Sequence, residues 1–257
     1  MFFPGSFDLP MAREAGALVV QAYEQFQHVH AGEAWSLQGN YDFLGSFEAD
    51  PPGLLSHTEP FGFVARNRTS GLTFVTFRGT QTLEDWFSNI SFPQVPHSWG
   101  KAEEGFAKLY AQCADKVHAG VRSAGAQSRV VTTGHSLGSA LATLAAADLI
   151  QSGVIPTTEM YNFASPRVGD RAFVAEFNRR IPQAWRIVNT EDIVTTVPIA
   201  TPVLSGGRPH TALAGILRLL HQLDYAHVGS PIDFTLHGGS IAANHDMNTY
   251  ISALPPG

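Results

Sequence analysis

A chain of 257 residues can bury a substantial core, and its 44% hydrophobic and 15% charged residues are typical of a globular protein. The formal net charge of −6 and the lack of a Lys/Arg cluster argue against nucleic acid as a partner, and against strong attraction to anionic lipid headgroups. The one cysteine, Cys113, excludes an intrachain disulfide. No apolar run approaches the length of a transmembrane helix.

The first ten residues are punctuated by Pro and Gly and are expected to form an extended arm. They carry neither a basic region nor a long apolar segment, so they do not predict a signal peptide. The localisation therefore stays open between the cytoplasm and export with a leader absent from this sequence. The oligomeric state also stays open.

Apolar residues at helical spacing predict an amphipathic helix over residues 11–26. Residues 39–60 look loop-rich because Pro and Gly interrupt them. Residues 61–67 and 72–78 then read as two strands joined by a hairpin-type turn, so the sheet is expected to begin with an antiparallel pair.

Residues 81–92 have the pattern of a short amphipathic helix. The apolar positions fall at i, i+3, i+4 and i+7 on one face: Leu83, Trp86, Phe87 and Ile90. Such a helix either packs on the core or acts as a lid, with its apolar face over a site in water and turned outward at a lipid surface. Its position directly after a strand favours the lid.

The second half of the chain alternates strands and helices. A helix is expected over residues 100–123, with Cys113 on its buried face as an inert thiol. After a strand and helix around residue 136 come a strand over 160–164, a helix over 171–180 and a strand over 184–189. This order predicts an α/β fold with a mostly parallel sheet, in one domain spanning residues 1–257.

The strand–helix junction carries Gly-His-Ser-Leu-Gly at residues 134–138. A G-x-S-x-G sequence between a strand and a helix is typical of a nucleophile elbow, in which side chains at the two glycines would collide with the neighbouring strand and helix. Ser136 would then be displayed at the helix N-terminus, where free N–H groups and the helix dipole favour an oxyanion.

A serine nucleophile needs a base, and the base works best when a carboxylate orients it. In an α/β-hydrolase the acid and then the base follow the serine along the chain. The candidate acids are Asp148, Glu159, Asp170, Glu176, Glu191, Asp192, Asp224 and Asp233, of which Glu191 and Asp192 directly follow a predicted strand. The candidate bases are His210, His221, His227, His237 and His245, and spacing alone does not choose among them.

Several short motifs together resemble the class 3, filamentous-fungal type, lipases of the α/β-hydrolase fold. They are Val-Thr-Phe-Arg-Gly-Thr at 75–80, Gly-Phe at 105–106, the elbow with Ser-Ala at 134–140, Phe-Ala-Ser-Pro-Arg-Val-Gly at 163–169, Asn-Thr-Glu-Asp-Ile-Val at 189–194 and Asn-His at 244–245. Because these motifs are collinear over roughly residues 60 to 250, the resemblance is far more specific than the elbow alone.

The resemblance implies a mostly parallel central sheet flanked by helices, with Ser136 as nucleophile, Asp192 as acid and His245 as base. The elbow pattern itself makes the backbone N–H of Leu137 one donor of the oxyanion hole. The resemblance implies Thr80 as the other donor, and a role outside catalysis for His227. It also strengthens the interpretation of residues 81–92 as a lid that lines the substrate site.

Residues 198–224 depart from the family pattern and look like an insertion between the acid and the base. Residues 211–223 have helical spacing. We expect residues 212–223 either to help wall the acyl pocket or to form a purely structural helix.

The expected function is that of a serine carboxylic-ester hydrolase, with triacylglycerol lipase preferred and a soluble-ester carboxylesterase, feruloyl esterase or phospholipase as alternatives. A non-catalytic binding protein of the hydrolase fold is the alternative from another class. We expect no cofactor and no metal, because metal-binding and nucleotide-binding motifs are missing. The expected partner is a lipid or ester substrate, including one at a lipid–water interface.

Overall fold

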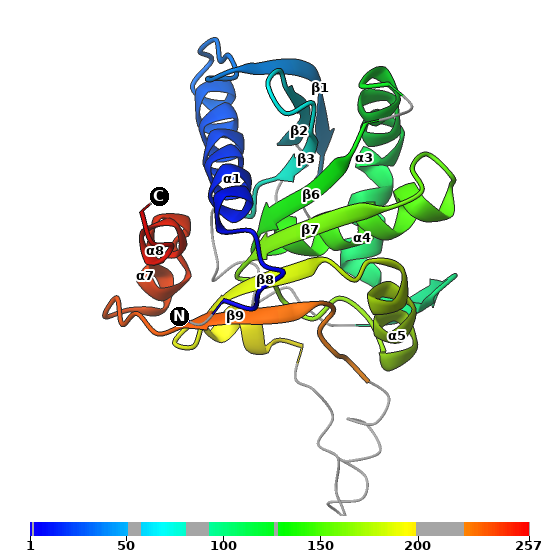
Figure 1. Ribbon diagram of the computed structural model, residues 1–257, viewed down its shortest axis with the longest axis vertical. Coiled ribbons are helices and arrows are strands. Elements are labelled where there is room, and N and C mark those ends of the chain that lie inside the picture. Colours follow the sequence, from blue (N-terminus) through cyan, green and yellow to red (C-terminus); the bar gives the residue numbers. More distant parts are fainter. Residues whose placement is uncertain (2, 51–57, 81–92, 126–127, 199–223, 257) are drawn as a thin grey trace, which may run out of the picture.

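The structure is a computed structural model that describes residue 1 and residues 3–50, 58–80, 93–125, 128–198 and 224–256. Its centre is a seven-stranded sheet with the strand order β1-β2-β3-β6-β7-β8-β9 (Figure 1). The antiparallel strands at one edge are β1 (Tyr41–Ala49), β2 (Glu59–Asn67) and β3 (Thr73–Phe77). The strands that continue from β3 in parallel are β6 (Val130–His135), β7 (Thr158–Phe163), β8 (Ala184–Asn189) and β9 (Ser230–Phe234).

Helices cover both faces of this sheet (Figure 1). One face carries α1 (Leu9–His30), α7 (Ile241–His245) and α8 (Met247–Ala253); the opposite face carries α3 (Glu104–Ser123), α4 (Leu137–Gln151) and α5 (Arg171–Arg180). The short η1 (Ile193–Thr196) follows β8, and β4 (Gln94–His97) pairs with β5 (Gly100–Glu103) in a separate hairpin. Among the described residues, no helix is both long enough and apolar enough to span a bilayer.

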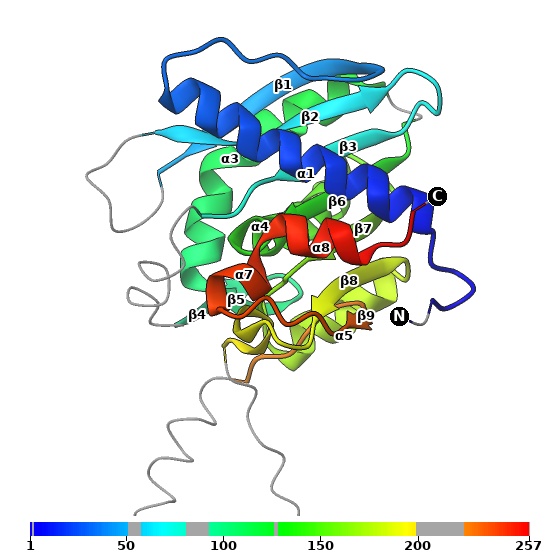
Figure 2. The same cartoon turned by 90° about the vertical axis from the view of Figure 1, so that its left-hand side faces the viewer.

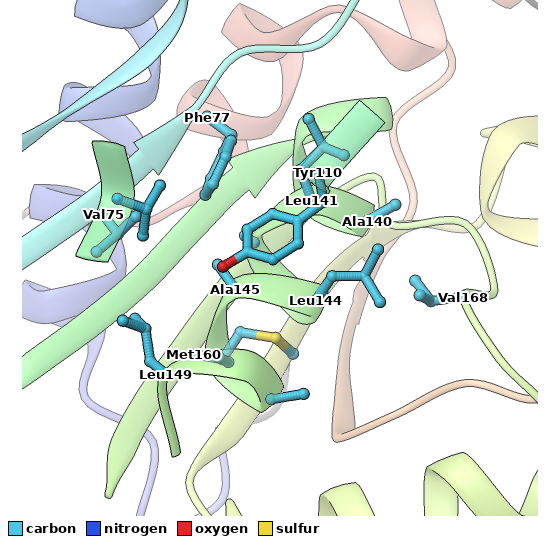
Figure 3. Close-up of a cluster of buried hydrophobic side chains, with 14 of the residues drawn as sticks. Val75, Phe77, Tyr110, Ala140, Leu141, Leu144, Ala145, Leu149, Met160 and Val168 are labelled. Carbon is cyan, nitrogen blue, oxygen red and sulfur yellow. The ribbon is translucent and has the colours of Figure 1, made fainter. Parts of the chain in front are cut away.

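Each face of the sheet has its own apolar core. On the α3–α4 side, Phe77, Tyr110, Leu141 and Met160 pack together (Figure 3). On the other side, the buried stripe of α1 lies against the sheet and against α8 (Figure 2). Successive residues of a strand point to opposite faces, so β3 sends Val75 to the first core and Phe74 to the second. The sheet is thereby buried on both sides, as parallel strands require.

Helices α1 and α5 each begin directly after an aspartate that serves as the N-cap. Asp8 caps α1 by accepting a hydrogen bond from the backbone of Met11 at 2.9 Å, with Pro10 in the first turn. Asp170 caps α5 in the same way through Phe173. The observed α1 is longer at both ends than the predicted helix over 11–26, and the residues before it form a shorter arm.

Several predicted elements agree with the structure. Helix α5 and strand β8 have the predicted bounds, and Cys113 lies fully buried on α3, where burial raises the pKa of its thiol to about 12. The alternation of strands and helices and the mostly parallel sheet are also confirmed.

Other predicted elements were wrong. Residues 39–60 contain β1, so the sheet begins with three antiparallel strands; two register shifts in its pairing with β2 break the alternation that would have marked it. The helix predicted over 100–123 starts at Glu104, because Gly100–Glu103 pairs with β4 and the Glu103 side chain caps the helix. Strands β4 and β9 were not predicted. The predicted lid at 81–92 and most of the predicted insertion at 198–224 lie outside the described residues.

Candidate active site

The turn between β6 and α4 holds Ser136 in a strained conformation. Its φ of 57° and ψ of −128° belong to a region that non-glycine residues rarely occupy. A Cβ atom at Gly134 would lie 2.3 Å from the carbonyl oxygen of Gly138, and one at Gly138 would lie 2.2 Å from that of Arg78. The two glycines therefore allow the tight turn, as the elbow pattern predicts.

The side chain of Ser136 is buried, and its Oγ has no hydrogen-bond partner within the described part of the chain. The next residue, Leu137, begins α4, so its N–H has no acceptor within the helix. A hydroxyl without a competing partner next to a free N–H group at a helix N-terminus is suited to attack a carbonyl and to hold the resulting oxyanion.

The loops after β8 and before α8 bring an acid and a base together. His245 Nδ1 donates a hydrogen bond to Asp192 Oδ2 at 2.7 Å, and both side chains are almost completely buried. Because the carboxylate accepts the hydrogen bond from Nδ1–H, the proton of the neutral ring stays on Nδ1 and Nε2 is unprotonated, which is the tautomer that a general base requires. His245 Nε2 has no partner among the described residues. His245 ends the short helix α7.

Asp192 is held by two further donors. The backbone N–H of Val194 donates to Oδ1 at 2.9 Å, and the Tyr250 hydroxyl donates to Oδ2 at 2.6 Å. Donors on both oxygens fix the plane of the carboxylate. Tyr250 was not among the predicted site residues, because a tyrosine on the buried side of a C-terminal helix looks like an ordinary core residue.

The backbone of the base lies close to the elbow. His135, the residue before Ser136, donates from Nε2 to the carbonyl oxygen of His245 at 2.8 Å, and the two imidazole centroids are 4.6 Å apart. Ser136 Oγ and His245 Nε2 are not hydrogen bonded to each other. In serine hydrolases this contact often tightens only when the substrate binds.

The loop after β3 is anchored by Arg78. This fully buried guanidinium donates to the carbonyl oxygens of Pro60 at 2.6 Å and Gly79 at 2.7 Å, pairs with Glu59, and lies 3.9 Å from the centre of the Phe26 ring. Burial lowers its pKa from the ordinary value. Arg78 is therefore a structural anchor of this loop.

Thr80 comes two residues after that anchor. Its Oγ1 is buried without a hydrogen-bond partner in the described part of the chain, as are Ser136 Oγ and His245 Nε2. Unpartnered buried polar atoms are rare in folded proteins and are often tied to function. Such atoms also occur elsewhere in the described residues, His227 Nδ1 among them, so they mark this site only together with the geometry of the elbow and of the His245–Asp192 pair.

The other candidate acids and bases have different partners. The Asp148 carboxylate accepts hydrogen bonds from Tyr110 and His118, and Glu191 pairs with the exposed His237. His227 hydrogen bonds the Thr195 carbonyl oxygen at 2.8 Å, and burial lowers its pKa to about 3. Ion pairs or helix caps engage four more acids: Glu159, Asp170, Glu176 and Asp224.

Among the described candidates, two acid–base pairs form: Asp192 with His245 at 2.7 Å, with both side chains buried, and Glu191 with His237 at 3.2 Å, with both side chains exposed. The buried pair is the one beside the elbow, because His135 contacts the backbone of His245. His210 and His221, and the predicted lid residues Leu83, Trp86, Phe87 and Ile90, lie outside the described residues.

A family model described as lipase (class 3) matches residues 74–201. A phospholipase A1 of Oryza sativa subsp. indica is 34% identical over 213 residues, covering 70% of this chain and 47% of the relative. A secreted mono- and diacylglycerol lipase of Penicillium cyclopium is 30% identical over 186 residues, covering 70% and 56%. The chain thus spans about half the length of these curated relatives.

Solved lipase structures have the same fold. The lipase of Rhizopus microsporus var. chinensis matches with a TM-score of 0.66 and 25% identity, over 89% of this chain and 76% of that one. The triacylglyceride lipase of Rhizomucor miehei matches with a TM-score of 0.67 and 23% identity, over 90% and 82%. The chain has an α/β-hydrolase fold and belongs to the class 3 lipase family.

Proposed function

We propose that this protein is a serine carboxylic-ester hydrolase that acts on acylglycerols, with Ser136, His245 and Asp192 as its catalytic triad. The hydrogen bond of 2.7 Å between His245 and Asp192 carries the proposal, because it leaves the second imidazole nitrogen free for the serine at the elbow. The proposal treats the chain as one α/β-hydrolase domain and requires neither a cofactor nor a metal.

The reaction follows from the roles of these groups. His245 Nε2 takes the proton of Ser136 Oγ as that oxygen attacks the ester carbonyl carbon, and Asp192 stabilises the imidazolium that forms. Backbone N–H groups of Thr80 and Leu137, with the Thr80 hydroxyl, hold the negative oxygen of the tetrahedral intermediate. The intermediate collapses when His245 returns the proton to the leaving alcohol. Water, deprotonated by His245, then releases the acid from the acyl-enzyme.

The first test replaces the nucleophile. Ser136→Ala should lower the turnover of a soluble p-nitrophenyl ester by at least about 10,000-fold, because no acyl-enzyme can form. A fluorophosphonate probe should label the wild-type protein at Ser136 and leave the variant unlabelled. Turnover by Ser136→Ala at the wild-type rate would refute the assignment, and a wild-type protein that neither reacts with the probe nor hydrolyses esters would favour a binding protein.

The second test concerns the base. His245→Gln should abolish turnover, whereas His227→Gln should keep turnover within a few-fold of wild type, because His227 hydrogen bonds the Thr195 carbonyl oxygen and not the Asp192 carboxylate. The reverse result would contradict the choice of His245.

The substrate is proposed to lie at a lipid–water interface, with residues 81–92 as the lid and Leu83, Trp86, Phe87 and Ile90 lining the substrate site. The amphipathic pattern of this segment and its position after Thr80 support the proposal. A rate that rises sharply above the solubility limit of a triacylglycerol would support a lipase with a moving lid. A hyperbolic dependence without that rise would favour a soluble-ester carboxylesterase or feruloyl esterase.

A phospholipase A1 is the second candidate, because a relative that is 34% identical bears that name. Both candidates use the same triad, so the distinction depends on the leaving group. Competition between emulsified triacylglycerol and phosphatidylcholine vesicles, followed by measurement of the released fatty acid and the lysolipid, separates them.

A further inference from the structure

A chain of buried hydrogen bonds joins the oxyanion loop to the catalytic base. The backbone N–H of Gly79 donates to the Tyr23 hydroxyl at 2.9 Å, and this hydroxyl contacts His135 Nδ1 at 2.8 Å. His135 Nε2 contacts the carbonyl oxygen of His245 at 2.8 Å. The links join four separate segments, which are the loop after β3, the helix α1, the elbow and the helix α7.

The chemistry of these atoms allows one direction for every bond. A backbone carbonyl oxygen can only accept, so His135 Nε2 carries the proton and Nδ1 must accept. The Tyr23 hydroxyl therefore donates to Nδ1, and its oxygen accepts from Gly79. Burial and the neighbouring His245 lower the pKa of His135 well below its ordinary value, which keeps the ring neutral as this direction requires.

The residues of this chain of hydrogen bonds are tightly packed around Gly79. A Cβ atom at Gly79 would lie 2.5 Å from the Tyr23 hydroxyl oxygen, 2.8 Å from the carbonyl oxygen of His135 and 2.9 Å from the Ser136 Cβ. The oxyanion loop, α1 and the elbow are therefore packed directly against one another. A shift of any one of them would move the backbone next to Thr80, Ser136 or His245.

We infer that Tyr23 and His135 are positioning residues for the proposed hydrolysis, and that together they set the separation between the oxyanion hole and the catalytic base. Tyr23 fixes Gly79, and with it the direction of the Thr80 N–H group. His135 fixes the backbone of His245, and with it the position of the His245 imidazole relative to Ser136. The inference rests on the proposed function.

The test compares two tyrosines that each lose one buried hydroxyl. Tyr23→Phe should lower kcat for a soluble p-nitrophenyl ester by about 10- to 100-fold with KM within about twofold, since small errors in alignment have effects of this size. Tyr110→Phe is the matched control, because the Tyr110 hydroxyl donates to Asp148 within the core on the α3–α4 side (Figure 3). It should keep kcat within about twofold, while thermal melts report the stability of both variants.

A second variant tests the coupling. In His135→Gln the side-chain NH2 group can replace Nε2 as the donor to the His245 carbonyl oxygen, whereas the ring nitrogen Nδ1 that accepts from Tyr23 is removed, so the variant breaks the same link from the other side. The double variant Tyr23→Phe/His135→Gln should therefore lower kcat little more than the stronger single change. Nitrogen-15 NMR of the wild type should find the proton of the His135 ring on Nε2.

The possible outcomes separate this inference from the proposed function. If the wild type hydrolyses the ester and Tyr23→Phe behaves like Tyr110→Phe, the positioning role is wrong while the triad stands. The positioning role would also be wrong if the double variant lost kcat by the product of the two single losses. A proton found on His135 Nδ1, or a raised KM with unchanged kcat in Tyr23→Phe, would contradict it as well. A wild type without any hydrolysis would instead refute the proposed function.

Discussion

At the scale of single residues, the geometry of the site depends on the absence of a side chain at Gly134 and at Gly138. The strained backbone of Ser136 persists because β6 and α4 hold it from both sides. Gly134 sits where a methyl group would meet the backbone of Gly138. The position of Ser136 on the elbow therefore depends on the close packing of β6 against α4 as well as on the local sequence.

Gly134→Ala should destabilise the protein by about 1–3 kcal/mol and abolish ester turnover, because the added Cβ would force the elbow apart. Gly5→Ala is the matched control, since a Cβ atom there would meet nothing within 4 Å. Urea unfolding and turnover of a soluble ester measure the two effects. Equal stability and activity for the two variants would mean that the tight turn is not required.

In the proposed reaction, Asp192 acts by fixing the tautomer of His245. Asp192→Asn keeps the size of the side chain but favours a proton on the wrong imidazole nitrogen, so kcat should fall by about 10,000-fold. Asp148→Asn provides a matched control, because Asp148 is also a carboxylate bonded to an imidazole, that of His118, at 2.6 Å. Steady-state kinetics at neutral pH should find Asp148→Asn within a few-fold of wild type, and an equal fall in both variants would argue against Asp192 as the acid.

At the scale of elements, β2 and the end of β3 are joined by one buried cation. Arg78 binds Pro60 and Glu59 at the start of β2, and Gly79 next to Thr80 in the proposed oxyanion loop. Its contact with the Phe26 ring adds α1 to the same assembly. The position of Thr80 is therefore set by three elements and not by its own strand alone.

Arg78→Met should remove about 3 kcal/mol of stability, because two carbonyl oxygens and Glu59 lose their partner. It should also lower kcat, since the oxyanion loop loses its anchor. Arg129→Met removes the ion pair of an exposed arginine with Glu159, which is worth at most about 1 kcal/mol. Thermal and urea unfolding measure the difference, and equal losses for the two variants would contradict the anchoring role.

At the scale of the whole molecule, buried neutral histidines link stability to pH. Burial lowers the pKa of His227 from 6.5 to about 3, so between these values the unfolded chain binds a proton that the folded chain does not. The stability present above pH 6.5 is therefore lost as the pH falls, by up to about 1.4 kcal/mol per pH unit for each such histidine. His135 contributes in the same direction.

His227→Asn should accordingly flatten the dependence of the unfolding free energy on pH between about pH 6.5 and 4. His30→Asn, at an exposed position near the end of α1, is the control. Urea unfolding at a series of pH values makes the comparison. A slope for His227→Asn that matches wild type would show that another group causes the loss of stability in acid.

The sequence alone determined the features that neighbouring residues decide. The elbow around Ser136, the bounds of α5 and β8 and the alternation of strands and helices depend on turn residues, caps and periodicity within short windows. The interrupted strand β1 was not predicted, because its bulges break the periodicity on which a strand is recognised. Family motifs, and not spacing, selected Asp192 and His245 from the candidate acids and bases.

Tertiary structure decided which side chains meet. The bond from His245 to Asp192 joins residues 53 positions apart, and the bond from Tyr23 to His135 joins residues 112 positions apart. No local pattern encodes such pairs, because they meet only when α1 and α7 pack on the same face of the folded sheet. The serine at the elbow was thus evident from its own neighbourhood, whereas the buried bonds around it exist only in the folded molecule.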